Sequence, residues 1–105
     1  MMLEVNKENF EQEVLNQKGL VLVDYWSPKC EPCMELLPSM EELEAKFESV
    51  KFCKLDILKN RRLAIGQKVM GLPTILIYLD GEKKGELSKD FSIEDVEQKL
   101  RELGA

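Results

Sequence analysis

The sequence predicts a single α/β domain with a central mixed sheet of four to five strands and helices on both faces of that sheet. Apolar segments rich in β-forming residues alternate with stretches of helical periodicity, which indicates parallel strands joined by helical crossovers. Near the end, Asp80-Gly81 separates two adjacent strand-like segments, which is typical of a hairpin and adds an antiparallel edge. Because the chain has 105 residues and no linker-like stretch, we expect residues 1–105 to form one domain.

The first segments alternate between strand and helix. Residues 3–5 predict a short strand, and Asn6 is a typical N-cap for a helix that ends near Gly19. The apolar face of that helix comprises Phe10, Val14 and Leu15. Residues 20–23 read Leu-Val-Leu-Val, an uninterrupted apolar run that favours a strand buried on both faces, and Asp24 follows directly.

A longer helix follows and begins at Pro32 and Cys33. Proline suits the first turn of a helix because the N–H groups there have no partner within the helix. The apolar positions that recur at helical spacing are Leu36, Met40, Leu43 and Phe47. Pro38 lies inside this helix and should kink it. Residues 50–55 then predict another strand.

The last part of the chain opens with a short helix predicted at 60–68, which one glycine interrupts. Residues 74–79 and 83–87 predict the two strands of the hairpin. Ser92, with Asp95 three residues later, resembles a capping box at the start of a final helix. The apolar stripe of this helix comprises Ile93, Val96, Leu100 and Leu103.

The composition excludes several classes of function. The chain has no histidine, which removes imidazole-based triads, proton shuttles and zinc sites. Its three cysteines cannot fill a four-thiolate zinc or iron–sulfur site, so we expect no metal ion. We expect no bound cofactor either, because a pair of cysteines can carry electrons itself. The formal charge is −5, and lysines alternate with glutamates, so no basic run predicts nucleic-acid binding.

Two further expectations concern location. No basic segment followed by an apolar one is present near residue 1, so we expect no secretory signal. The most apolar stretches, 20–23 and 72–79, fall short of the ~20 residues that cross a bilayer, so we expect no membrane contact. A cytoplasmic location is therefore expected, where thiols stay reduced and a disulfide is usually transient and catalytic.

The residues that carry chemistry lie between the buried strand and the long helix, in the segment Trp26-Ser27-Pro28-Lys29-Cys30-Glu31-Pro32-Cys33. A C-x-x-C pair also occurs in zinc sites, but those need a second ligand pair that this chain does not have. With strands and helices alternating around it, the pair indicates a redox dithiol. Two purely structural cysteines are the remaining alternative.

The predicted helix start explains why such a pair would be reactive. Unpaired N–H groups and the positive end of the helix dipole favour the thiolate, which is the nucleophile in disulfide exchange. Cys30 lies at the turn and should be the more exposed cysteine, whereas Cys33 lies within the helix. We therefore expect Cys30 to attack a substrate disulfide and Cys33 to resolve the mixed disulfide.

Over essentially its whole length the sequence resembles the thioredoxin family, which implies the thioredoxin fold. Besides the cysteine pair, the resemblance rests on residues at matching positions, namely Asp24, Pro38, Lys54-Leu55-Asp56 and Gly71-Leu72-Pro73-Thr74. The Cys-Glu-Pro-Cys centre is similar to that of atypical thioredoxins from amino-acid-fermenting, clostridia-like anaerobic bacteria. Those proteins work with a dedicated flavoprotein reductase.

The resemblance also implies roles for individual residues. Asp24 would lie buried beneath Cys33 and assist its deprotonation, and Lys54 would modulate this aspartate. Pro73 would follow a cis peptide bond, and Leu72 would offer backbone hydrogen bonds to the substrate. The substrate-binding surface would comprise Trp26, Lys29, Glu31, Pro32, Leu72, Pro73 and Gly85.

The residues themselves leave alternatives open. Burial at the end of an apolar strand should raise the pKa of Asp24, which suits a proton acceptor near neutral pH, but an aspartate there also suits a helix or turn cap. Lys54 also fits a solvent-facing strand lysine, and Trp26 also fits a core aromatic. Cys53, in the strand predicted at 50–55, fits core packing or a regulatory thiol.

The expected function is that of a thiol–disulfide oxidoreductase, a monomer that reduces protein disulfides and is recycled by a flavoprotein thioredoxin reductase. A disulfide oxidase or isomerase and a noncatalytic interaction module are the alternatives. Oxidising relatives tend to place histidine between the cysteines, where this chain has Glu31, and the intact Cys30 and Cys33 argue against a purely noncatalytic role. Lys29 should stabilise the Cys30 thiolate and Glu31 should oppose it, so we expect these charges to affect partner choice more than chemistry.

Overall fold

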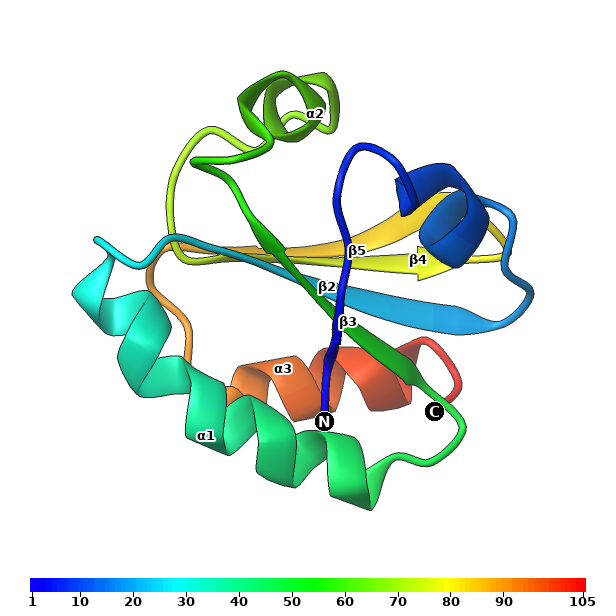
Figure 1. Ribbon diagram of the computed structural model, residues 1–105. Coiled ribbons are helices and arrows are strands. Elements are labelled where there is room, and N and C mark those ends of the chain that lie inside the picture. Colours follow the sequence, from blue (N-terminus) through cyan, green and yellow to red (C-terminus); the bar gives the residue numbers. More distant parts are fainter.

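The centre of the protein is a five-stranded sheet, described by a computed structural model that covers residues 1–105 (Figure 1). In chain order its strands are β1 (Leu3–Glu4), β2 (Leu20–Trp26), β3 (Lys51–Asp56), β4 (Thr74–Leu79) and β5 (Glu82–Ser88). Their order across the sheet is β1-β3-β2-β4-β5. Strands β1, β3 and β2 are parallel, β4 is antiparallel to β2, and β5 is antiparallel to β4.

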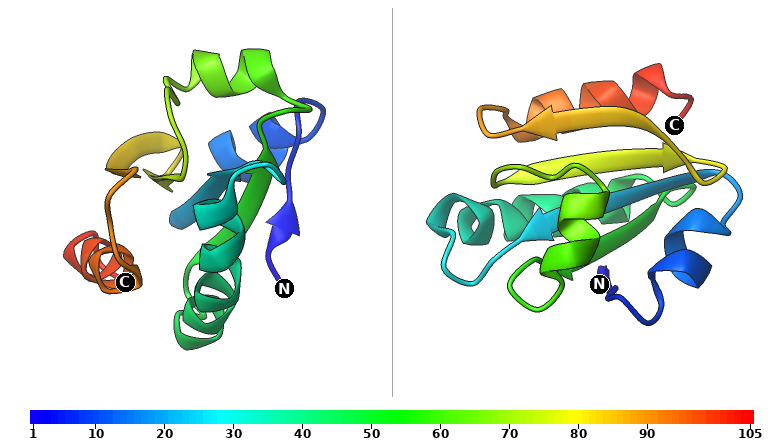
Figure 2. Two further views of the ribbon diagram at one scale, coloured as in Figure 1. Left: turned by 90° about the vertical axis from the view of Figure 1, so that its left-hand side faces the viewer. Right: turned by 90° about the horizontal axis from the view of Figure 1, so that it is seen from above.

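Helices cover both faces of this sheet, as the sequence predicts. The helical segments are η1 (Glu11–Leu15), α1 (Glu31–Lys46), α2 (Arg61–Gly66) and α3 (Ile93–Glu102). Figures 1 and 2 show α1 and α3 on one face, and η1 and α2 on the other. The prediction of a mixed sheet with helices on both faces is confirmed.

Alternation along β2 divides the core between the two faces. Leu20 and Leu22 pack with buried residues of α1 and α3, whereas Val21, Val23 and Tyr25 pack with buried residues of η1 and α2. Successive strand residues point to opposite faces, so the next even-numbered position of β2 also faces α1. Strand β3 divides in the same way, since its Phe52 belongs to the first cluster and its Cys53 to the second.

The prediction of parallel crossovers is wrong for one connection, because β4 runs antiparallel to its neighbour β2. Helix α2 spans six residues, about 9 Å, whereas a six-residue strand is about 20 Å long. The helix in the connection between β3 and β4 is therefore too short to carry the chain back to the other end of the sheet. As a result, β4 begins at the edge where β3 ends.

The first helix also differs from its prediction. The Asn6 side chain does accept N–H bonds, from Glu8 at 2.9 Å and Asn9 at 3.1 Å, but these close a turn before the helix. The helix itself is a short π-helix, and the N–H of Asn16 bonds to the carbonyl of Glu11 at 2.8 Å. The capping box predicted at the start of α3 is present, with Ser92 and Asp95 each accepting the other's backbone N–H.

The hairpin contains a feature that the sequence pattern does not reveal. Asp80 and Gly81 both have positive φ, 52° and 83°, as a tight hairpin turn requires. The register then shifts, because Tyr78 pairs with Lys83 but Ile77 pairs with Gly85. One extra residue in β5 forms this β-bulge, which moves every later residue of β5 by one position.

Candidate active site

The strand directions bring three loops to one edge of the sheet. Parallel β2 and β3 end there together, with Trp26 paired to Asp56. Antiparallel β4 begins there, with Thr74 paired to Tyr25 of β2. The loops that follow β2, follow β3 and precede β4 are therefore neighbours, although 46 positions separate Trp26 from Leu72.

The cysteine pair lies where the first of these loops enters α1. Cys30 is the N-cap residue, and its sulfur accepts the backbone N–H of Cys33 at 3.3 Å. The two residues form a disulfide across Cα atoms 5.2 Å apart. Cys33 is completely buried, whereas Cys30 is partly exposed. This is the asymmetry that the sequence predicts for a resolving and an attacking cysteine.

Short hydrogen bonds fix the loop ahead of the pair. The carbonyl of Ser27 accepts the N–H of Cys30 at 3.0 Å, and the Ser27 hydroxyl accepts the N–H of Lys29 at 3.1 Å. Lys29, Glu31 and Pro32 are all exposed around Cys30, and neither charged side chain forms an ion pair. Their positions fit the predicted substrate-binding surface.

Asp24 is fully buried, and neither of its carboxylate oxygens has a hydrogen-bond partner. The alternative that Asp24 caps a turn or a helix is therefore wrong. Its even-numbered place in β2 puts it on the face covered by α1. Burial raises its pKa from 3.8 to about 7, although the charge of Lys54 pulls the value back. A carboxyl group that titrates near neutral pH is suited to proton transfer.

Lys54 pairs with Asp24 across the β2–β3 ladder and lies on the same face of the sheet. It forms no ion pair with a carboxylate, so its effect on Asp24 acts through space. Its ammonium lies 5.6 Å from the centre of the Trp26 ring, a cation–π contact. The half-buried Trp26 has an indole N–H that is buried without an acceptor. The pairing of β2 with β3 thus places Asp24, Lys54 and Trp26 next to one another on the same face of the sheet.

The loop before β4 has the geometry that the resemblance implies. The peptide bond between Leu72 and Pro73 is cis, and Leu72 remains partly exposed. The hydroxyl of Thr74 donates to the carbonyl of Gly71 at 2.6 Å, and the N–H of Lys89 donates to the carbonyl of Pro73 at 2.8 Å. These bonds hold the loop against the sheet edge.

Gly85 is the predicted site residue that the structure does not bring to this edge. It is buried in the middle of β5, where a side chain would meet Lys99 of α3 and Leu103, the C-cap residue of that helix, both at 3.2 Å. The residue that sequence reasoning missed is Lys89, which lies against the loop. A side chain at Gly71 would come within 2.6 Å of the Lys89 Cε. If the residues of β4 and β5 are paired outward from the Asp80-Gly81 turn, Lys89 comes opposite Pro73 only when the extra residue in β5 is included.

The third cysteine lies on the other side of the sheet. Cys53 is buried in the cluster beneath η1 and α2, away from the face that α1 covers. Burial raises its pKa to about 11. A buried thiol of this kind stays protonated and packs as a small apolar residue, which fits the core-packing alternative. The structure contains no cluster of three or more cysteine and acidic side chains able to hold a metal ion.

Comparison with known proteins agrees with this geometry. The family model described as thioredoxin matches residues 1–102. The chain belongs to the thioredoxin family. A thioredoxin from Acetoanaerobium sticklandii is 56% identical over 90 residues, which cover 85% of this chain and 86% of the relative. A thioredoxin from Peptoclostridium acidaminophilum is 50% identical over 91 residues, covering 86% and 83%. The predicted resemblance to thioredoxins of clostridia-like bacteria is confirmed.

Relatives from other bacteria are also similar over most of their length. A thioredoxin from Listeria monocytogenes is 40% identical over 83 residues, which cover 78% of this chain and 79% of the relative. As a thioredoxin-family protein with a Cys30–Cys33 redox pair, the chain has disulfide reductase activity. Membership of this family implies, in general terms, a reductase and disulfide substrates as partners. None of its helices combines the length and the apolar character that a membrane crossing requires.

Proposed function

We propose that Cys30 is the attacking nucleophile of this reductase and that Cys33 resolves the intermediate. The Cys30 thiolate attacks one sulfur of a substrate disulfide, which forms a mixed disulfide and releases one substrate thiolate. The Cys33 thiolate then attacks the Cys30 sulfur and releases the second substrate thiolate. The substrate gains two electrons and takes up two protons, and the protein is left with the Cys30–Cys33 disulfide. The observation that carries this order is the partly exposed Cys30 at the N-cap beside a fully buried Cys33.

Asp24 supplies proton transfer in this scheme. A Cys33 thiol must lose its proton before it can attack, and no histidine is present to accept it. The Asp24 carboxylate lies on the α1 face and has no competing hydrogen bond. With a pKa of about 7, it accepts a proton without requiring a strongly basic environment. Lys54 limits how far that pKa rises.

Substrate contacts come from the loops at the sheet edge. The proposed surface includes Leu72, whose backbone stands beside the cis bond, and the exposed Lys29, Glu31 and Pro32 around Cys30. Trp26 contributes a half-buried ring and an indole N–H without an acceptor inside the protein. Gly85 has no place in this surface because it packs against α3.

The partner that recycles the disulfide is proposed to be a flavoprotein thioredoxin reductase, with disulfide-containing proteins as substrates. The cytoplasm is the proposed location, since reducing conditions there keep a dithiol available. The proposal treats residues 1–105 as one monomeric domain without a bound cofactor, because the dithiol itself carries the electrons.

Reduction of insulin in the presence of dithiothreitol tests the two cysteine roles. Cys30→Ser should abolish catalysis, whereas Cys33→Ser should accumulate a covalent mixed disulfide that reductant releases. Cys53→Ser is the matched control and should retain activity, because that thiol lies on the opposite face of the sheet. Wild-type turnover by Cys30→Ser, or trapping by Cys30→Ser rather than Cys33→Ser, would contradict the assignment.

A further inference from the structure

Charge is distributed unevenly along this acidic chain. Residues 51–71, from β3 to the loop before β4, contain six lysines or arginines and a single acidic residue. That segment has a formal charge of +5, although the whole chain has −5, so the remainder has −10. The one acid, Asp56, is buried and accepts the N–H of Leu58 at 2.9 Å. Its carboxylate therefore does not offset the lysines and arginines on the surface.

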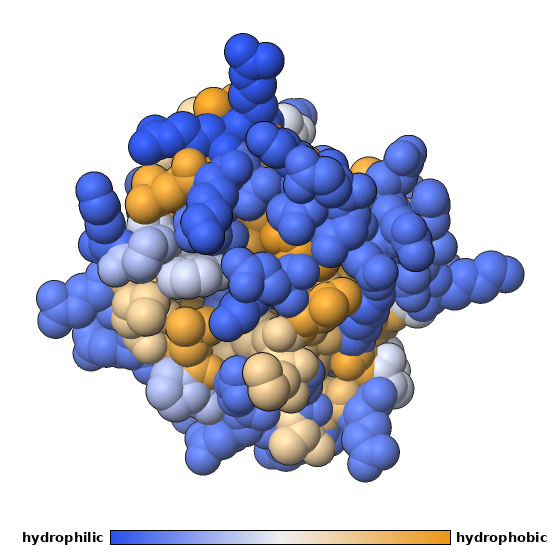
Figure 3. All heavy atoms as spheres, viewed as in Figure 1, coloured by the Kyte–Doolittle hydropathy of each residue, from blue (hydrophilic) through white to orange (hydrophobic).

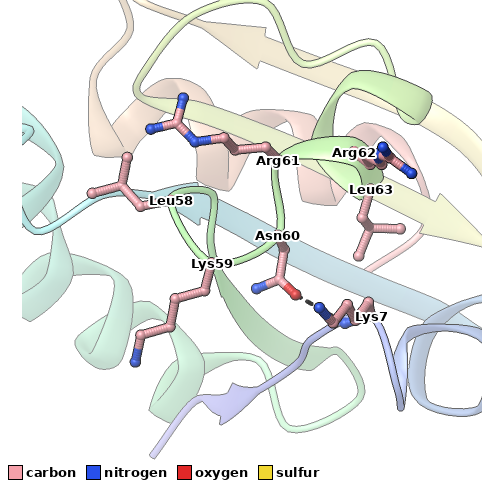
Figure 4. Close-up of a pocket in the computed structure, with 7 residues that line it drawn as sticks. All are labelled: Lys7, Leu58, Lys59, Asn60, Arg61, Arg62 and Leu63. Carbon is pink, nitrogen blue, oxygen red and sulfur yellow. Dashed lines mark hydrogen bonds between the residues drawn. The ribbon is translucent and has the colours of Figure 1, made fainter.

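Four of the cations around this segment form one surface, which we call the basic face and define as Lys7, Lys59, Arg61 and Arg62. All four are exposed, and none forms an ion pair. Together they line a pocket of about 300 Å³ at the turn from β3 to α2 (Figure 4). Asn60 lies between them and uses its side chain to bond Lys7 and Asp56 backbone groups.

The basic face adjoins the active site. The N–H of Ile57, at the start of the loop that carries Lys59, donates to the carbonyl of Trp26 at 2.9 Å. Trp26 is four residues before Cys30, so the loop with Lys59 and the loop with Cys30 leave the same sheet edge side by side. A molecule that approaches Cys30 from this side meets the basic face.

The fold gives no local reason for these cations. Arg61 and Arg62 occupy the first turn of α2, which contains no acidic residue, although cations at that end oppose the helix dipole. The other two α-helices have the favourable order, with Glu31 in the first turn of α1 and Glu94 in the first turn of α3. Local violations of such rules are expected where function requires them.

The arrangement of the side chains indicates what kind of anion would fit. In Figure 4 the side chains of Lys59, Arg61 and Arg62 point in different directions from the turn and do not converge on one point. A single small anion could not contact all of them. Figure 3 shows a mostly hydrophilic surface over α2. The diverging cations suit an extended acidic surface with several separated carboxylates.

We propose that the basic face recognises acidic residues that flank the disulfide of protein substrates, and thereby selects and steers them toward Cys30. This inference rests on the proposed role of Cys30 as the attacking nucleophile. Charges at the rim of an interface act mainly on the association rate and on its salt dependence. Nucleic acid is the less suitable polyanion, because the rest of the chain has a formal charge of −10, which would repel a long polyanion that extends beyond the basic face.

Synthetic disulfide peptides test the proposal. Two peptides share one internal disulfide, flanked by four aspartates in the first and by four lysines in the second. The reduced protein is mixed with each peptide, and the second-order rate constant is followed by acid quenching and chromatography at about 20 mM and about 0.5 M salt. The test variant is Lys59→Glu/Arg61→Glu. The control variant, Lys18→Glu/Lys84→Glu, has the same net charge but changes residues toward the hairpin end of the sheet.

The test variant should reduce the aspartate peptide about tenfold more slowly than wild type at low salt, and the difference should disappear at high salt. The control variant should lose clearly less of its rate with the aspartate peptide. Neither variant should reduce the lysine peptide more slowly than the wild type does. Equal losses for the two variants, or equal losses for the two peptides, would overturn the inference. So would binding of a single-stranded oligonucleotide to the basic face without any preference between the peptides. Failure of the wild type to reduce either peptide would instead overturn the proposed function.

Discussion

Replacing Asp24 by asparagine should make the protein more stable at alkaline pH. The side chain is fully buried and its oxygens accept no hydrogen bond, so ionisation in the folded state is opposed by desolvation alone and helped only by Lys54. Asparagine has nearly the same shape but never ionises. The substitution therefore removes the charge without opening a cavity.

The magnitude follows from the pKa of about 7 in the folded state against the ordinary value of 3.8. One pKa unit corresponds to about 1.4 kcal/mol, so ionised Asp24 lowers the free energy of unfolding by about 4 kcal/mol above pH 7. Between the two values the folded state binds more protons than the unfolded state. Wild-type stability should therefore fall by about 1.4 kcal/mol per pH unit as pH rises toward 7, and then level off.

Urea unfolding of the oxidised protein from pH 5 to pH 8 measures this effect. Few other groups change this pH dependence between pH 5 and pH 8. The chain has no histidine, the disulfide removes the thiols of Cys30 and Cys33, and burial raises the pKa of Cys53 to about 11. The lowered pKa of Glu97 contributes at more acidic pH only. From pH 5 to pH 8, the stability advantage of Asp24→Asn should grow by about 2–3 kcal/mol.

Glu31→Gln is the matched control, because it removes an exposed carboxylate beside the same cysteine pair. Its stability should follow the wild-type curve across the window. A wild-type curve that is flat from pH 5 to pH 8, or an Asp24→Asn curve that stays parallel to it, would refute the reasoning that burial holds the Asp24 proton.

Three other substitutions test separate parts of the structure. Lys54→Met should raise the pKa of Asp24 above 7 and move the pH profile of disulfide reduction to higher pH, and an unmoved profile would contradict the through-space effect. Cys53→Ala should lower the free energy of unfolding by about 1 kcal/mol with unchanged insulin reduction, whereas lost activity would show that the thiol takes part. Gly81→Ala should cost more than about 1 kcal/mol in thermal unfolding, since φ is 83° and its side chain would strike the Leu15 carbonyl. Gly19→Ala, with φ 82° but open space, should cost less, and equal costs would remove the steric argument.

The sequence predicts most of the fold because its signals are local. The apolar run at 20–23, the capping box at Ser92 and the turn at Asp80-Gly81 each specify their element without reference to distant residues. The direction of β4 is different, since it depends on how far the short α2 can carry the chain. The length of this helix and its place on the sheet depend on the tertiary structure. The alternation of strands and helices in the sequence therefore wrongly predicts a parallel crossover here.

In the candidate site, too, the residues that local signals specify can be predicted from the sequence, and those that depend on strand pairing cannot. Cys30 and Cys33 are set by one short motif, and the burial of Asp24 follows from the apolar strand before it. Gly85 lies in the middle of β5 with or without the bulge, so the resemblance places it wrongly at the site. Its face could not be assigned from the sequence either, because one extra residue in β5 shifts the register by one. A one-residue shift exchanges the faces of a strand. No local pattern in the sequence marks this bulge, and only the paired strands reveal it.

The properties of Asp24 connect stability with proton transfer through one physical cause. Hydrogen bonds to its carboxylate would stabilise the fold at neutral pH, but they would also lower its pKa and make it a poor proton acceptor. The buried Asp24 carboxyl has no such hydrogen bonds, so its pKa is raised and it can accept a proton near neutral pH, but its charged form destabilises the fold there. Because no histidine can replace it, a variant that gains stability at pH 8 by losing this charge should also resolve mixed disulfides more slowly. The two effects should arise over the same pH range, since both follow the ionisation of Asp24, and a separation of their midpoints would show that another group controls the resolving step.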